Sequence, residues 1–270
     1  MSALTWSACV RDSSGMPLTS VRANVPLRSA SVGKLLLLLH VARALSDGPL
    51  PPGEMLTREP VDAVADSGLW WYLSVDTLPV VDAAQLVGAV SDNLATNVLL
   101  RRVGLDAVAG TAAYLGLSRT ALHDKVRDVR SPTDPPTLST GTAGELSRLT
   151  HRIAAGAALG PEPDLQVEQW LSANVDLSMV GSAFVDRLGL DPLAHMDGPV
   201  RVFNKTGTDA GVRADVGAAT FDGRTVAWAA LANWSADDVS CERRLAVEAL
   251  ARMRQVGLEV LGHLAPGAVV

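Results

Sequence analysis

The fold is decided at residues 29–45, which read Ser-Ala-Ser-Val-Gly-Lys-Leu-Leu-Leu-Leu-Leu-His-Val-Ala-Arg-Ala-Leu. The apolar run predicts a buried helix over 35–45 that ends at Asp47-Gly-Pro. Lys34 follows Ser31 by three residues at the start of this helix, so the two side chains lie on one face, one turn apart. This stretch therefore places a serine hydroxyl within reach of a lysine nitrogen.

The sequence on either side of this stretch changes its period twice. Upstream, alternating residues predict a hairpin of strands over 4–11 and 18–25. The middle of the chain is helical in pattern, with helices expected over 80–90, 93–103, 106–116, 142–155 and 165–174. Strand patterns return over 200–204, 211–221 and 225–234, and a long helix is expected over 236–264.

These patterns predict an α/β fold, of the α+β kind, with two lobes. The chain ends, residues 1–48 and 185–270, form an α/β lobe, and residues 49–184 form an all-helical lobe inserted between them. A chain of 270 residues can bury a substantial core without disulfides, so nothing demands that Cys9 and Cys241 pair. We expect a site at the seam between the lobes.

Composition excludes several classes of partner. A formal charge of −6 without a clustered basic face argues against nucleic acid, and no apolar run is long enough to span a membrane. The five histidines are scattered, so no metal or cofactor is expected. The N-terminus shows neither region of a secretory signal, which predicts a cytoplasmic protein, or a secreted one if a leader has been removed. We expect a monomer.

Lysine is rare enough to be informative, because the chain has only Lys34, Lys125 and Lys205 among 23 basic residues. A serine hydroxyl is a weak nucleophile and needs an adjacent base. A desolvated lysine beside another cation can act as that base, which arginine cannot do. N–H groups at the start of the helix would stabilise an oxyanion. Ser31 and Lys34 are therefore the candidate nucleophile and base, and Lys205 is the candidate second cation.

Two further elements complete the pattern. Ser91-Asp-Asn precedes the expected 93–103 helix, where the Ser91 hydroxyl could relay a proton and the Asn93 amide could hold a carbonyl. Lys205-Thr-Gly-Thr lies at the end of an edge strand, where Gly207 would let a substrate approach the backbone closely. Ser-x-x-Lys, Ser-Asp-Asn and Lys-Thr-Gly, in this order, are the signature elements of the penicillin-recognising serine hydrolases.

The chain resembles a class A β-lactamase in particular. Ser91 follows Ser31 by 60 residues, which agrees with the family's usual gap. The similarity extends through Asn93-Leu-Ala-Thr-Asn-Val-Leu-Leu, Gln169-Trp-Leu and the long final helix, so it covers nearly the whole chain. The resemblance implies a β-lactamase/transpeptidase-like fold in which an antiparallel sheet flanked by helices is joined to an all-helical lobe.

The resemblance also implies a role for each matching residue. Ser31 would be the acylated nucleophile, Lys34 its general base and Ser91 the proton shuttle to the leaving nitrogen. Asn93 would orient the amide of the substrate's side chain. The N–H groups of Ser31 and Thr208 would form the oxyanion hole. The substrate carboxylate would lie against the third motif, namely Lys205, Thr206, Gly207 and Thr208, with Arg213 either sharing this role or lying at the surface.

The resemblance fails in one loop. Class A enzymes carry a glutamate about 35 residues after the Ser-Asp-Asn serine, in a Glu-x-x-Leu-Asn element, and it activates the water that frees the acyl-enzyme. That window contains no glutamate in this chain. Asp124 or Asp128 could substitute, although Lys125, Arg127 and Arg130 make a solvated charge cluster the alternative interpretation. Losing a positioned base costs about 10²–10⁴ in rate, so we expect ready acylation and slow release.

The sequence thus predicts a serine hydrolase that acts through an acyl-Ser31 intermediate on a β-lactam, or on a related amide or ester. The alternatives are a D-alanyl peptidase, an esterase or an acyltransferase on the same scaffold, and a penicillin-binding protein that is acylated without turnover. Trp70, in the cluster Trp70-Trp71-Tyr72, is a candidate to stack on the substrate, with core packing as the alternative.

Overall fold

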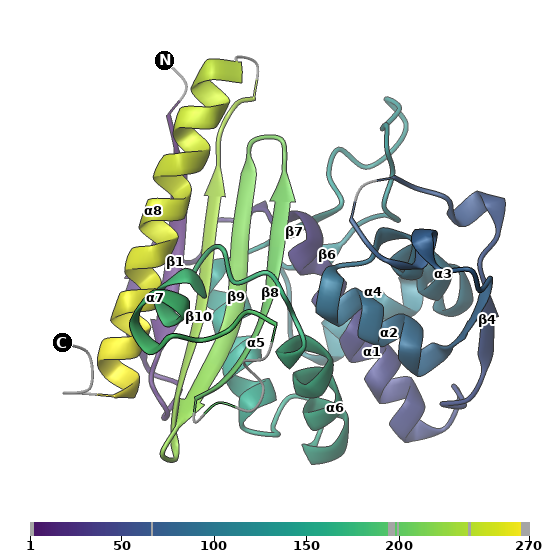
Figure 1. Cartoon of the computed structure of the whole chain (residues 1–270), viewed down its shortest axis with the longest axis horizontal. Coiled ribbons are helices and arrows are strands. Elements are labelled where there is room, and N and C mark those ends of the chain that lie inside the picture. Colours follow the sequence, from purple (N-terminus) through teal and green to yellow (C-terminus); the bar gives the residue numbers. More distant parts are fainter. Residues whose placement is uncertain (1–2, 66, 194–197, 199, 237–238, 266–270) are drawn as a thin grey trace.

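A five-stranded antiparallel sheet forms one half of the molecule and a group of helices forms the other (Figure 1). The computed structural model describes residues 3–65, 67–193, 198, 200–236 and 239–265. The strands run in the order β2-β1-β10-β9-β8, with β1 at Thr5–Arg11, β2 at Pro17–Val21, β8 at Arg201–Asp209, β9 at Val212–Phe221 and β10 at Arg224–Asn233. Because β1 pairs with β10, strands from near the two ends of the chain lie side by side in one sheet.

Alternate residues of β10 supply the two faces of this sheet. Ala227 and Ala229 are buried in the core on the α5 side, whereas Trp228 and Ala230 are buried on the α8 side. Three helices cover the faces: α5 at Ala143–Ala154 on one, and α7 at Ser182–Leu188 and α8 at Val239–Leu264 on the other. Small residues in the strand let both layers approach closely, so the sheet is a tightly packed support for its edge strand β8.

The helical half is built around α1, whose run Leu35–Leu39 is entirely buried. This run packs against α2, α3, α4 and α6, and none of the described helices is long and apolar enough to cross a bilayer. The helices are α1 at Lys34–Asp47, α2 at Val80–Val90, α3 at Asn93–Val103, α4 at Leu105–Tyr114 and α6 at Pro161–Ser172. The short strands are β3 at Leu27–Arg28, β4 at Met55–Thr57, β5 at Thr77–Pro79, β6 at Ala121–Leu122 and β7 at Ser139–Gly141.

Several elements differ from the expected ones. β8 extends to Asp209 because its whole length pairs with β9, so the third motif lies inside this edge strand. β2 ends at Val21, since Arg22 has a φ of +48°. α7 was not expected from the periodicity, and α5, which falls in the range expected for the helical lobe, packs on the sheet. His195 and residues 237–238 of the expected final helix lie outside the described residues.

Candidate active site

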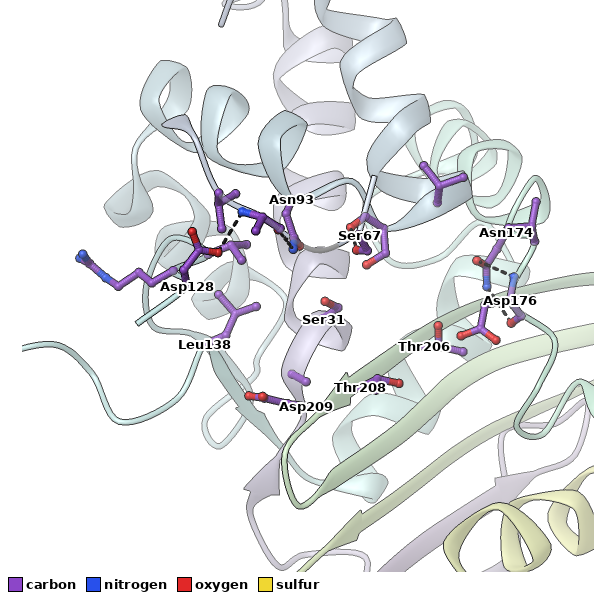
Figure 2. Close-up of a pocket in the computed structure, with 18 of the residues that line it drawn as sticks. Ser31, Ser67, Asn93, Asp128, Leu138, Asn174, Asp176, Thr206, Thr208 and Asp209 are labelled. Carbon is purple, nitrogen blue, oxygen red and sulfur yellow. Dashed lines mark hydrogen bonds between the residues drawn. The ribbon is translucent and has the colours of Figure 1, made fainter. Parts of the chain in front are cut away.

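A cleft of about 500 Å³ opens between the edge strand β8 and the helical half of the molecule. In Figure 2, Ser31 lies between Asn93 and Thr208, and Asp128 and Asp176 lie at opposite ends. The rest of the lining includes Ala65, Ser67, Ser91, Arg127, Arg130, Leu138, Asn174, Thr206 and Asp209. The structure therefore brings residues from all three sequence motifs to one cleft.

Ser31 lies in a single 3₁₀ turn, Ala30–Gly33, immediately before α1. Ala30 has a φ of +47°, which an alanine adopts only when its neighbours impose it. Ser139 on β7 supplies that constraint, because its hydroxyl donates to the Ala30 carbonyl at 2.6 Å and lies 2.7 Å from Ser29 Oγ. A Cβ at Gly33 would lie 2.3 Å from Ser139 Cβ, so this position requires glycine. The turn that carries Ser31 is therefore fixed from β7.

Lys34 is completely buried, and its Nζ reaches the segment that joins α2 to α3. Nζ lies 2.6 Å from the Ser91 carbonyl oxygen, 2.7 Å from Asn93 Oδ1 and 3.2 Å from Ser91 Oγ. The first two partners only accept, so two N–H groups satisfy them and the third position on nitrogen can hold a proton or a lone pair. This geometry suits both the ammonium and the neutral amine, as a general base requires.

The Ser91-Asp-Asn segment is held by the two helices that it joins. Ser91 ends α2 in the left-handed region, with φ of +56°. The Asp92 carboxylate accepts three backbone N–H groups, those of Leu69, Trp70 and Ala95. Asn93 Nδ2 donates to the Ala65 carbonyl at 3.1 Å, which leaves Oδ1 for Lys34. The hydroxyl of Ser91 and the amide of Asn93 are thereby oriented at the cleft.

Lys205 lies behind the cleft wall, where it is fully buried and donates to the Thr206 carbonyl at 3.0 Å. Burial lowers the pKa of Lys205 to about 8, against the opposing effect of the nearby Asp176 and Asp215 carboxylates. Thr206 and Thr208 themselves line the cleft. The third motif thus presents two hydroxyls to the cleft with a positive charge behind them.

Gly207 faces the turn that carries Ser31. A Cβ at this position would lie 2.3 Å from the Ser29 carbonyl oxygen and 3.1 Å from the Ser31 backbone nitrogen. Gly207 was expected to let a substrate come close to the backbone of β8. In the structure, the backbone of residues 29–31 comes close to Gly207 instead. This contact places β8 directly against the N–H group of Ser31.

A buried polar network that the sequence analysis missed lies behind Lys205. The Asp215 carboxylate accepts hydrogen bonds from the Val180 N–H, Asn204 Nδ2 and Trp228 Nε1, at 2.9, 3.2 and 3.2 Å. Burial raises the pKa of Asp215 to about 6. Asn174, which lines the cleft, donates to Asn204 Oδ1 at 2.7 Å. No motif marks these residues, because they meet only through the pairing of β8 with β9 and the end of α6.

Trp70 does not contact the cleft. Its side chain is fully buried, and its ring Nε1 donates to the Val75 carbonyl at 3.1 Å. The prediction that Trp70 stacks on a substrate is therefore wrong, because the tryptophan anchors its own turn. Its neighbours Trp71 and Tyr72 are instead 59% and 79% exposed.

Arg213 lies opposite Thr208 in the β8–β9 pairing but is not among the residues that line the cleft. Its guanidinium donates to the carbonyls of Asp209 and Val212, at 3.1 and 2.7 Å, and lies over the Trp234 ring at 5.8 Å. In this conformation Arg213 supports the end of β8. Its expected contact with a substrate carboxylate stays a prediction.

The loop that lacks a glutamate holds its two aspartates in different ways. Asp124 is 4% exposed, and its Oδ2 lies 2.6 Å from Arg127 Nε and 2.6 Å from Arg130 Nη1. Burial opposes ionisation, but the hydrogen bonds from these arginines outweigh it and lower the pKa of Asp124. Asp124 does not line the cleft, whereas Asp128 does, with Oδ1 accepting from the Ala65 N–H at 2.9 Å.

The fold and the serine-bearing turn at its cleft define a serine hydrolase with a β-lactamase/transpeptidase-like fold. No curated protein matches the chain by sequence. The chain belongs to the beta-lactamase enzyme family Beta-lactamase2, whose model matches residues 2–262.

Solved structures agree with this fold. A β-lactamase from Sphaerobacter thermophilus has a TM-score of 0.80 at 24% identity, over 98% of this chain and 94% of that chain. The chromosome-encoded β-lactamase of Vibrio parahaemolyticus has a TM-score of 0.77 at 17% identity, over 98% and 95%. A mutant of PBP-A, described as an acyl-enzyme complex with penicillin G, has a TM-score of 0.75 at 22% identity, over 95% and 90%.

Proposed function

We propose that Ser31 is acylated by β-lactams, or by related amides and esters, and that the acyl group is released slowly. The observation that carries this proposal is the bridge from Lys34 Nζ to Ser91 and Asn93, in the cleft that Ser31 lines. Neutral Lys34 would take the hydroxyl proton as Ser31 Oγ attacks the carbonyl carbon. Ser91 would pass a proton to the leaving nitrogen as the C–N bond breaks.

The groups that would recognise the substrate lie at Ser31 and along strand β8. The N–H groups of Ser31 and Thr208 would bind the oxyanion, and their proximity is supported by the contact of Gly207 with the turn. A substrate carboxylate would lie against Thr206 and Thr208, in the field of the Lys205 ammonium. The PBP-A neighbour, described as a penicillin G acyl-enzyme, supports a penicillin as the probe.

Slow release of the acyl group is expected because neither Asp124 nor Asp128 is well placed to activate water. Asp124 does not line the cleft, and its charge is neutralised by Arg127 and Arg130, which do. Asp128 lines the cleft, but one of its oxygens is bonded to the Ala65 N–H. We therefore assign Asp128 as the weak base for the deacylating water. This arrangement favours a penicillin-binding type of enzyme over an efficient β-lactamase.

A time course of intact mass with penicillin G tests nucleophile and release together. We expect one covalent adduct on the wild-type protein that decays over minutes or longer, and none on Ser31→Ala. Ser46→Ala, an exposed serine on α1 far from the cleft, is the matched control and should acylate normally. Acylation of Ser31→Ala at the wild-type rate would refute the proposal.

The same experiment separates the other functions of this scaffold. Adduct loss with rapid hydrolysis of a chromogenic cephalosporin would favour an efficient β-lactamase. Transfer of the acyl group to an added D-amino acid or alcohol would favour a D-alanyl peptidase, an esterase or an acyltransferase. An adduct that never decays would favour a binding protein without turnover.

A further inference from the structure

A second hollow adjoins the cleft at the end where Asp128 lies. Its volume is about 330 Å³, and it shares four lining residues with the cleft, namely Val64, Ala65, Ser67 and Asp128. Its other walls are Ala63, Gly68, Trp71, Tyr72, Asp92 and Leu94. Because Asn93 Nδ2 is bonded to the Ala65 carbonyl, the two spaces meet beside the amide of Asn93.

Trp71 and Tyr72 give this hollow an aromatic wall that is open to solvent. They are 59% and 79% exposed, although large aromatic side chains are usually mostly covered. The turn that carries them is firmly held, because Trp70 is fully buried and Asp92 accepts its backbone N–H at 2.8 Å. A Cβ at Gly68 would lie 2.5 Å from the Asp92 carboxyl carbon. Little conformational freedom would therefore be lost when a ligand covers this wall.

The polar groups around the hollow already have partners inside the protein. The Asp92 carboxylate accepts three backbone N–H groups, and Ser67 Oγ donates to the Ser91 carbonyl at 2.9 Å. An occupant would gain mainly by burying apolar surface against the aromatic wall. A cavity of about 150 Å³ holds benzene, so this space is large enough for an arylalkyl group.

We propose that this hollow is a substrate subsite for the apolar end of a long acylamino side chain, carried by a substrate whose β-lactam or scissile amide carbonyl is attacked by Ser31. The inference rests on the proposed function and narrows its substrate class to β-lactams or amides that carry an arylalkyl group. With the side-chain amide of the substrate held at Asn93, the chain beyond it enters the second hollow and lies against Trp71.

The test compares two penicillins that share one nucleus, an acetyl derivative and a 4-phenylbutanoyl derivative. The second-order rate constant for acylation of each is measured by intact mass. We expect the phenylbutanoyl derivative to react about tenfold faster with the wild-type protein and expect Trp71→Ala to abolish this preference. Leu69→Ala is the matched control and should keep the wild-type ratio, because Leu69 is 48% exposed on the same turn and lines neither space.

An equal ratio in wild-type and Trp71→Ala proteins overturns the subsite while leaving the proposed function intact, provided that both compounds acylate Ser31. If neither compound acylates Ser31, the proposed function fails, and the subsite is then judged by binding. Calorimetry measures the affinity of the phenylbutanoyl derivative for Ser31→Ala with and without Trp71→Ala. A loss of about tenfold supports the subsite, and equal affinities overturn it.

Discussion

Lys34 and Asp124 are both buried charged residues, but their surroundings differ in kind. Lys34 is held by neutral oxygens, two of which accept from either protonation state of the amine. Asp124 is held by two guanidinium groups that cannot give up their protons. Neutral oxygens accept from an ammonium and from a neutral amine alike, whereas the two guanidinium groups favour only the ionised carboxylate.

The proposed function gives the two environments different roles, a reacting amine at Lys34 and a structural ion pair at Asp124. Two arginines around one carboxylate fix the course of the loop. Substitution at Lys34 or at Asp124 breaks this contrast directly, and changes at Lys205 and Asp128 should have smaller effects.

Lys34→Arg tests whether the buried cation must lose its proton. Arginine keeps its charge at all accessible pH values, so acylation by penicillin G should fall about 10³-fold, within the usual range for loss of a general base. The measurement is the intact-mass acylation rate. Lys125→Arg, in which the loop lysine that bonds the Val61 carbonyl is replaced, should change this rate less than twofold. Similar rates for Lys34→Arg and wild type would show that Lys34 is not the base.

Asp124→Asn tests the structural ion pair. The two arginines lose their shared countercharge, but their side chains are 30% and 23% exposed, so we expect a loss of about 2 kcal/mol and a fall in Tm of about 5 °C. Asp134→Asn, which removes a single more peripheral partner of Arg127, should lower stability by less than 1 kcal/mol. Calorimetric unfolding measures both. Should Asp124→Asn instead leave Tm unchanged and stop release of the acyl group, Asp124 would be catalytic.

The rate of acylation should fall at alkaline pH because Lys205 loses its charge there. Its pKa of about 8 lies below the ordinary 10.5, so its charge is present below pH 8 and lost above it. Acylation by a penicillin carboxylate should fall relative to the penicillin methyl ester by up to about tenfold per pH unit above 8. Dividing one rate by the other cancels every pH dependence that the acid and the ester share.

The lowered pKa of Lys205 also makes the free energy of unfolding depend on pH. Between pH 8 and 10.5 the unfolded chain binds more protons at this lysine than the folded chain, so its contribution to the free energy of unfolding rises with pH. Asp215→Asn removes a carboxylate that favours the ammonium, so it should move the alkaline limb to lower pH. A limb that stays at pH 8 in Asp215→Asn would assign it to another group.

Asp128→Asn should have the smallest effect. Asparagine can still accept the Ala65 N–H, so only the charge is removed. We expect release of the acyl group to slow by about tenfold at most, since the wild-type base is weakly placed. The rate of adduct decay measures this, with acylation as the internal control. Unaltered decay would exclude Asp128 as the group that activates water.

The fold, and the meeting of the first two motifs at one cleft, could be predicted because their signals are local. Ser31 lies in the turn just before α1, whose first residue is Lys34, and Asn93 is the first residue of α3, so spacing alone brings the first two motifs to helix starts. The shared sheet of the two chain ends follows from strand patterns at residues 4–11 and 225–234.

Other features of the site depend on contacts between residues far apart in the sequence, which motif spacing does not predict. Ser139 holds the turn of Ser31 from more than 100 residues away, and Asn174 reaches the third motif through Asn204. Which member of Trp70-Trp71-Tyr72 turns inward depends on the phase of one 3₁₀ turn. A sequence pattern cannot set that phase, because the backbone N–H groups of this turn are held by Asp92, over 20 residues away.

The packing of Gly207 on the nucleophile's turn has a consequence outside catalysis. β8 is an edge strand, and edge strands offer unpaired N–H and C=O groups to the strands of other chains. Here the 3₁₀ turn at Ala30–Gly33 and helix α6 both pack against β8. The opposite edge, β2, is only five residues long. The catalytic architecture therefore also shields the longer free edge of the sheet, so a change that loosens the turn would expose the protein to aggregation as well as inactivate it.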